Sequence, residues 1–317
     1  MKKIVLIWTA LLILVACSDS HQQAVPNFVP KNTQKTFSDN ARPVVLVDEA
    51  HHNFLTASGR YAPFVKVLKS DGYTVKRNAN PLSNQSLRDI DILVIANALD
   101  KNRTNWTPPF THALSSKEVT SIKDWIVSGG SLLLIADHTP FPRIIENLAD
   151  ELGFKFSHGH VDNAVFRLDH MTLTKHVITT HVREHEAQVL LPSLVTDNQK
   201  STTQTKVIQY VKTFGGSAFK APPEAVSLLT LGENAVSVVP QVPFQIDANT
   251  PRESMHGWSQ GAVLTLGKGR VAVFAEGMMF SSQYDARTKK TYGLNSKGAK
   301  YNEAFLLNVM SWLAGVI

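Results

Sequence analysis

The sequence contains a single cysteine, Cys17, among 317 residues. Disulfides, cysteine nucleophiles and thiolate metal sites are therefore excluded from everything that follows it. No dense run of lysine and arginine accompanies the formal net charge of +6, so the sequence shows no footprint of nucleic-acid binding. Repeats and low-complexity tracts are absent as well. A hydrophobic content of 43% with 18% charged residues is ordinary for a globular chain with a sizeable core.

The beginning of the chain has the pattern of a secretory signal. Two lysines precede an apolar segment that ends at Leu14 and is too short to span a membrane. The ending Leu14-Val15-Ala16-Cys17 resembles a bacterial lipobox, in which the cysteine becomes the first residue, carries acyl groups and anchors the protein to a membrane. Ser18 follows this cysteine, and a serine at that position resembles the pattern of lipoproteins that diderm bacteria export to the outer membrane. We therefore expect a lipid-anchored envelope protein that faces the periplasm.

The polar, proline-containing segment after Cys17 predicts a flexible tether. Beyond it, short apolar runs alternate with amphipathic segments, which predicts parallel strands connected by helices on both faces of a sheet. Between about residues 157 and 260 the pattern changes to short Thr- and Val-rich pieces, interpreted as a β-rich insertion. The expected organisation is a signal over residues 1–16, a lipidated cysteine and tether over 17–42, and a single α/β domain over 43–317.

Polar side chains follow four of the expected strands, at the point where each strand ends. In open α/β sheets ligands bind in the crevice beyond the carboxyl ends of the strands, so we expect these side chains to lie together. The group consists of Asp48, Glu49, His51, His52, Asn97, Asp137, His138 and Glu276. The candidate catalytic residues are His138, His51, Glu49, Asp137 and Glu276, with the histidines as bases and the carboxylates as their partners. Asp48 and Asn97 are candidate ligand-binding residues, and His52 is expected to face solvent.

The same side chains could instead bind a divalent metal ion. Imidazole and carboxylate groups bind zinc and other divalent cations, and such sites commonly leave one position open for water. The candidate metal ligands are His51, His138, Asp48 and Glu276. Spacing does not decide between the two uses, because these residues come from separate strands. No cofactor other than such a divalent metal is indicated.

Two histidine motifs lie in the β-rich region. His158-Gly159-His160-Val161-Asp162 would send His158, His160 and Asp162 to one face of an extended segment, which makes these three candidate ligand-binding residues. His181-Val182-Arg183-Glu184-His185 fits the H-x-x-E-H pattern of inverted zinc peptidases. The second motif lacks a strong apolar helix around it, which favours an exposed polar turn.

The order of the strand-end motifs resembles that of the class I glutamine amidotransferase-like superfamily. The motifs are VVLVDEAHHN, DILVIAN, DWIVSGGSLLLIADH and GKGRVAVFAEG, and the likeness covers about residues 43–156 and 260–315. It implies a mainly parallel, flavodoxin-like sheet in a three-layer α/β sandwich. The strand SLLLIAD ends in His138-Thr139-Pro140, similar to the strand-end histidine of the trehalose-utilisation-like branch. Glutaminase chemistry does not transfer, since it requires a cysteine in the turn between strand and helix.

These patterns together predict a ligand site at the carboxyl edge of the sheet. The expected ligand is a small polar or carbohydrate-type molecule, and its hydrolysis is one expected function. The alternative is a non-catalytic binding or assembly module that keeps the fold without the chemistry. The membrane is an expected partner through the lipid anchor, nucleic acid is not, and protein partners stay open.

Overall fold

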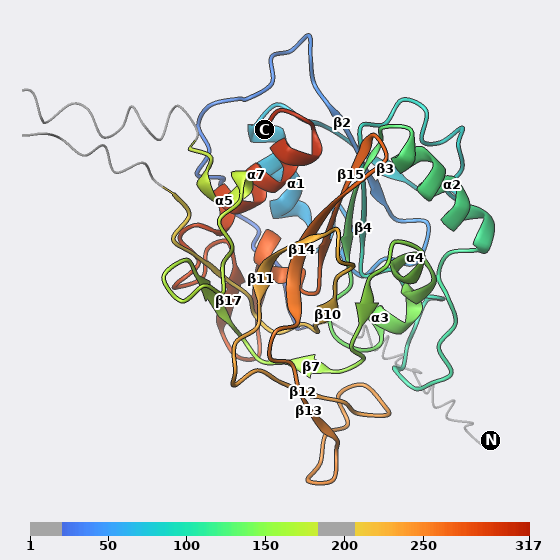
Figure 1. Cartoon of the computed structure of the whole chain (residues 1–317), viewed down its shortest axis with the longest axis vertical. Helices are drawn as coiled ribbons and strands as arrows, with labels where there is room; N and C mark the ends of the chain where they lie inside the picture. The colour runs from blue at the N-terminus through green and yellow to red at the C-terminus, as the bar shows by residue number, and fades with distance from the viewer. Residues whose placement is uncertain (1–20, 183–206) are drawn as a thin grey trace, which may run out of the picture.

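The computed structural model describes residues 21–182 and 207–317, and its centre is a nine-stranded sheet (Figure 1). One half of this sheet is parallel, in the order β3, β2, β4, β5, β15. These strands comprise β3 Thr74–Asn78, β2 Val44–Asp48, β4 Ile92–Ala96, β5 Ser131–Ile135 and β15 Gly269–Phe274. The chain order reverses at β2, which pairs with both β3 and β4. Such a reversal opens a crevice at the carboxyl ends of the strands.

Antiparallel strands extend the sheet beyond β15. They comprise β14 Ser259–Leu266, β10 Phe219–Lys220 and β6 Lys155–Phe156, with β11 Val226–Thr230 also paired to β14. The predicted β-rich region is therefore confirmed, and it contributes β10 and β11 to the central sheet itself.

Smaller sheets surround this centre in the described residues. One contains β1 Gln22–Ala24, β16 Ser282–Asp285 and β17 Lys290–Gly293, the next contains β7 His160–Val161, β12 Val236–Val238 and β13 Arg252–Ser254, and the last contains β8 Val165–Arg167 and β9 Tyr210–Lys212. Figure 1 shows β7 crossing the lower end of the central strands, with the β12–β13 hairpin below it. A short 3-10 helix, Met278–Phe280, follows β15 and precedes β16.

Helices cover both faces of the central sheet (Figure 1). On one face lie α1 Ala62–Ser70 and α7 Asn302–Leu313, with α5 Val177–Thr180 beside α7, and on the other lie α2 Ser116–Val127, α3 Phe141–Ile144 and α4 Glu146–Glu151. Val45 and Val47 pack with the first group, whereas Leu46 packs with the second. Successive strand residues point to opposite faces, so the continuous apolar runs form strands that are buried on both sides. The fold is the predicted three-layer, flavodoxin-like α/β sandwich.

The segment before the first parallel strand differs from the predicted flexible tether. β1 pairs antiparallel with β16, and Phe28 and Phe37 are buried in the core that contains α1 and α7. The backbone N–H groups of Lys31 and Asn32 also donate to Glu303 Oε1, at 2.6 and 2.9 Å. The prediction is thus wrong for residues 22–37, because two isolated aromatic side chains anchor a segment that is otherwise polar and aperiodic.

The predicted signal and the lipidation site at Cys17 lie outside the described residues, and their assignments stay predictions. Among residues 21–182 and 207–317, no helix is both long and apolar enough to cross a membrane.

Candidate functional site

The first strand-end group forms a buried ionic triad. His51 Nδ1 lies 2.7 Å from Asp48 Oδ2, and His51 Nε2 lies 2.9 Å from Glu118 Oε1. All three side chains are 10% exposed or less. Asp48 also accepts a hydrogen bond from Asn78 Nδ2 at 3.0 Å. Because both ring nitrogens of His51 are engaged, this histidine has no lone pair with which to accept a proton from a ligand.

Glu118 has two roles that use different oxygens. Its Oε2 accepts bonds from the backbone and hydroxyl of Ser115 in the capping box at the start of α2. Its Oε1 accepts from His51 and from the backbone N–H of Leu82 at 2.9 Å. The capping role follows from sequence, but the contact with His51 does not, since 67 residues separate the two.

The electrostatics of the triad favour a charged imidazole. Burial alone would lower the pKa of His51. The hydrogen bonds to Asp48 and Glu118 and the negative charges of these residues have the opposite effect, and the pKa of His51 is raised overall. Burial raises the pKa of Glu118, but bonds from Ser115 and Leu82 and the charge of His51 lower it overall. The triad therefore fastens the loop after β2 to the start of α2, which is a positioning role.

Two further strand-end residues also make structural contacts. Glu49 accepts hydrogen bonds from the Ala57 backbone N–H and from Arg77 Nε, both at 2.8 Å, and so lies apart from the triad. Asn97 Oδ1 accepts the backbone N–H of Asp137 at 2.9 Å, and its carbonyl accepts that of Phe54 at 2.9 Å. Asn97 thus joins the ends of β4 and β5. His52, as predicted, is exposed.

A second group lies at the ends of β5 and β15 and contains Asp137, Glu276 and Arg60. Glu276 is fully buried and accepts the backbone N–H groups of Met278 and Met279 at 2.6 and 3.0 Å. Burial and then the charge of Asp137 raise the pKa of Glu276 well above its usual value despite these bonds. The charge of Asp137 thus acts on both Glu276 and Arg60.

Arg60 was not among the residues predicted for the site. It lies two residues before α1, and its guanidinium carbon is 4.0 Å from the centroid of the Phe54 ring. Burial lowers the pKa of Arg60 to about 10, with the charge of Asp137 opposing that shift. Its side chain makes no hydrogen bond or ion pair within the described chain, so its donors are available to a ligand.

The two histidines His138 and His160 stack on each other. Their ring centroids are 4.5 Å apart, with an angle of 21° between the planes. His138 Nδ1 lies 2.8 Å from the Thr139 carbonyl oxygen and donates its proton there, which leaves Nε2 with a lone pair when the ring is neutral. His160 Nε2 is buried without a hydrogen-bond partner among the described residues. Burial, followed by the charge of His138, lowers the pKa of His160 to about 4, so its ring is neutral near pH 7.

Aromatic rings surround this pair. Phe244, an exposed residue with a positive φ of 68°, packs on His138 and His160 at centroid distances of 5.2 and 5.6 Å. Phe141 packs under His138, and Trp106 contacts both phenylalanines. Through Phe54, which contacts Trp106 and Phe141, the cluster extends to Arg60. Residues from widely separated parts of the chain thus form one group of rings, called here the histidine–aromatic cluster.

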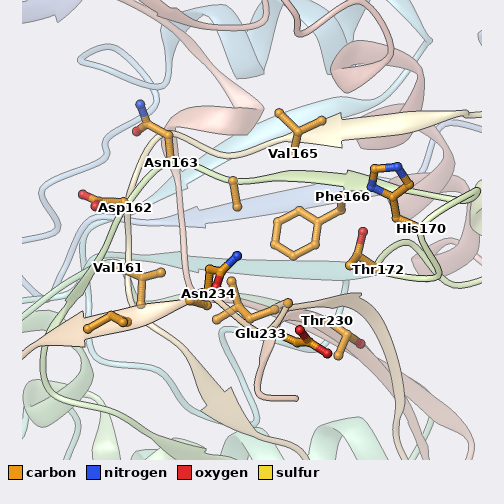
Figure 2. Close-up of a pocket in the computed structure, with 15 residues that line it drawn as sticks. Val161, Asp162, Asn163, Val165, Phe166, His170, Thr172, Thr230, Glu233 and Asn234 are labelled. Carbon is orange, nitrogen blue, oxygen red and sulfur yellow. The ribbon is translucent and has the colours of Figure 1, made fainter. Parts of the chain in front are cut away.

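The motif His158-Gly159-His160-Val161-Asp162 does not present its three polar residues on one face. His158 lies 3.2 Å from Glu146, and His160 stacks on His138. Asp162 is exposed and lines a separate cavity, shown in Figure 2. The expectation of a common face is wrong because β7 covers only His160 and Val161, and the chain leaves the extended conformation on both sides. The motif at 181–185 lies largely outside the described residues.

The four candidate metal ligands are not gathered into one centre. His51 and Asp48 belong to the buried triad, His138 belongs to the histidine–aromatic cluster, and Glu276 is held by backbone N–H groups. Within residues 21–182 and 207–317, no group of three or more His, Cys, Asp or Glu side chains is arranged to hold a metal ion. The proposed combination of these four residues as a zinc site therefore does not match the structure.

Comparison with known proteins supports the fold. No protein-family model matches the sequence, and no curated protein matches it significantly. Among solved structures, the N-terminal domain of mmIFT52 matches with a TM-score of 0.52 at 15% identity, over 85% of this chain and 97% of that one.

Two structures with lower scores are a protein named ThuA-like from Bacteroides uniformis and one named for GMP synthase from Thermoplasma acidophilum. Their TM-scores are 0.45 and 0.39 at 12% and 10% identity, with 92% and 87% of this chain and 95% and 94% of theirs covered. At 15% identity, the chain shares the fold of the mmIFT52 domain, and that likeness extends to the fold alone.

Proposed function

We propose that the histidine–aromatic cluster binds a small polar ligand of carbohydrate type. The observation that carries the proposal is the stacked pair His138 and His160, whose Nε2 atoms make no hydrogen bond within the described chain. Ligand sites typically combine apolar and aromatic walls with a few convergent polar groups. Here Phe244 and Trp106 supply ring faces, and Arg60 supplies unpaired donors next to them.

The cluster also favours a particular kind of polar group on the ligand. The guanidinium of Arg60 presents planar donors that match a carboxylate or a pair of hydroxyl groups. The Nε2 atom of His138 can accept from a hydroxyl group, because the Nδ1 proton of this ring is engaged by Thr139. A sugar that carries an acidic group would satisfy both the guanidinium donors of Arg60 and the imidazole acceptor, and the cell envelope contains such molecules.

Hydrolysis of the bound ligand is a second candidate function, favoured by the free Nε2 atom of His138. In this reaction His138 Nε2 takes a proton from water while the water oxygen bonds to the electrophilic carbon. The bond to the leaving group breaks, and the leaving group receives the proton from His138. Asp137 orients His138 through its Oδ1, which accepts the His138 backbone N–H at 2.9 Å. His51 takes no part in these proton transfers, since both its nitrogens are engaged.

We further propose that the protein reaches this ligand from a membrane. The lipobox-like segment that ends at Cys17 supports acylation of that residue, and Ser18 supports an outer-membrane address in a diderm host. Metabolic labelling with a fatty-acid analogue tests the anchor. The label should appear in the wild-type chain and be lost from Cys17→Ser, and equal labelling of both proteins would remove the anchor from the proposal.

The site itself is tested with the full-length chain in detergent. A panel of neutral and acidic oligosaccharides is screened for an increase in melting temperature of the wild type and of the variants His138→Ala and Arg60→Gln. His112→Ala and Arg88→Gln are matched controls, because both parent residues are exposed and make no side-chain contact in the described chain. Ligand-induced stabilisation should disappear in the first pair and persist in the controls. Equal stabilisation in all five proteins would exclude the cluster as the binding site.

Catalysis is tested separately from binding. Products of any stabilising oligosaccharide are followed by mass spectrometry with the wild type and His138→Gln, which keeps a polar side chain of similar size. Loss of hydrolysis with retained binding assigns the base to His138. Binding without hydrolysis in the wild type leaves the non-catalytic module as the function.

A further inference from the structure

A cavity of about 470 Å³ lies in the β-rich region, apart from the histidine–aromatic cluster (Figure 2). Three segments enclose it: residues 161–166, the turn at 170–172, and residues 230–236, which join β11 to β12. None of the side chains in the histidine–aromatic cluster lines it. Its volume falls within the range of roughly 300–1,000 Å³ that is usual for small-molecule sites.

Four polar side chains around this cavity lack partners within the described part of the chain. The side chains of Asp162, Asn163, Glu233 and Asn234 make no hydrogen bond or ion pair within residues 21–182 and 207–317. Such a set contrasts with the triad and with Glu276, where every carboxylate is engaged. Two carboxylates and two amides are thus free to contact a bound molecule.

The charge of the lining is opposite to that of the chain. The lining contains the carboxylates of Asp162 and Glu233 and no lysine or arginine. Its formal charge is therefore −2, with His170 counted as neutral. The whole chain has a formal net charge of +6. A local field of this sign attracts small cations and repels anions.

The floor of the cavity is apolar. Val161, Phe166 and Leu231 are buried, and Figure 2 shows the Phe166 ring between the segment that carries Asn163 and Val165 and the turn that carries Glu233 and Asn234. An apolar floor favours a ligand with a hydrocarbon body, and the carboxylates at the rim favour an ammonium group on that body. A hydrated metal ion does not match this floor.

We propose that this cavity is a second binding site and that it takes a small organic diamine, with Asp162 contacting one ammonium group and Glu233 contacting the other. The site is independent of the function proposed for the sheet edge, because the two share no side chain. It also places Asp162 in a ligand site that contains neither histidine of its motif.

The test uses the full-length chain and the diamine cadaverine, followed by isothermal titration calorimetry. Asp162→Asn and Glu233→Gln remove one charge each at exposed positions and keep the shape of the side chain. Each should weaken cadaverine binding about fivefold, and the double variant roughly 25-fold if the two contacts are independent. Higher salt should weaken binding by the wild type.

Asp89→Asn and Glu224→Gln are the matched controls, since both are exposed, make no side-chain contact in the described chain and lie outside the cavity. They should leave the affinity unchanged. Three results would overturn the proposal: no cadaverine binding by the wild type, equal binding of the uncharged pentanediol, or the same affinity in the double variant and the controls. His138→Ala should bind cadaverine normally, so failure of this site and failure of the sheet-edge site are distinguishable.

Discussion

Replacement of His51 by glutamine tests whether the buried triad holds the loop after β2. The variant removes a charged imidazole from between two carboxylates, at 2.7 Å from Asp48 and 2.9 Å from Glu118. Two charge-assisted hydrogen bonds contribute about 1.5–3 kcal/mol each, and glutamine can retain one neutral bond of about 1 kcal/mol. We expect His51→Gln to lower the free energy of unfolding by about 3 kcal/mol near pH 6, in line with the cost of breaking a buried ion pair.

The loss should depend on pH in a defined direction. The pKa of His51 is raised in the folded protein, so its contribution is complete below its usual value of 6.5 and is lost as pH rises through the folded value. The pKa of Glu118 is lowered, so its contribution is complete above its usual value of 4.5 and is lost as pH falls. The difference between wild type and His51→Gln should therefore be largest between these two values and shrink at higher and lower pH.

Urea unfolding followed by tryptophan fluorescence at about pH 6 and pH 9 provides the measurement. His112→Gln is the control, because His112 is exposed and makes no side-chain contact in the described chain, and it should change stability by less than about 0.5 kcal/mol. Glu118→Gln and the double variant complete a thermodynamic cycle with His51→Gln. A cost below about 1 kcal/mol near pH 6, or a cost that grows with pH, would refute a charged imidazole in this position.

Two further predictions concern the neighbouring site. In an NMR titration of the histidine ring protons, His160 should titrate near its pKa of about 4, whereas His51 should titrate above its usual value; a common midpoint would show that their environments do not differ as described. Gly216→Ala should lower the free energy of unfolding by more than about 2 kcal/mol in urea, because Gly216 has a φ of 101° and an added Cβ would lie 2.1 Å from the Ala275 carbonyl oxygen. An unchanged stability would mean that the backbone next to Glu276 can shift freely.

The parallel sheet could be predicted because its signal is local and repeated. Each strand is a continuous apolar run such as Ile92–Ala96, and each run ends in polar residues at the same edge. The position of the site at that edge follows from the parallel arrangement alone. Phe28 and Phe37 were missed because a lone aromatic residue in a polar segment has no periodicity that marks it as buried.

The partners within the site could not be predicted from the sequence. Glu118 shows a clear capping pattern, and nothing in that pattern indicates that its second oxygen contacts His51. Phe244 lies more than a hundred residues after His138 in a proline-rich loop, and only the folded chain brings the rings to 5.2 Å. The order of the strands determines which strand ends lie at the same edge of the sheet. The conformation of the loops determines which side chains contact each other there.

The loop after β2 connects the triad to the histidine–aromatic cluster. Its start is fixed by His51, whose carbonyl also accepts the backbone N–H of Leu99 at 2.9 Å, and its middle is fixed by the bond from Phe54 to Asn97. Phe54 in turn carries the guanidinium of Arg60 on its ring face. A shift of this loop would therefore move Arg60 relative to His138 without any change in the ligand-contacting atoms. His51, which the sequence predicts as one of two candidate bases, thus holds the loop on which Arg60 is presented.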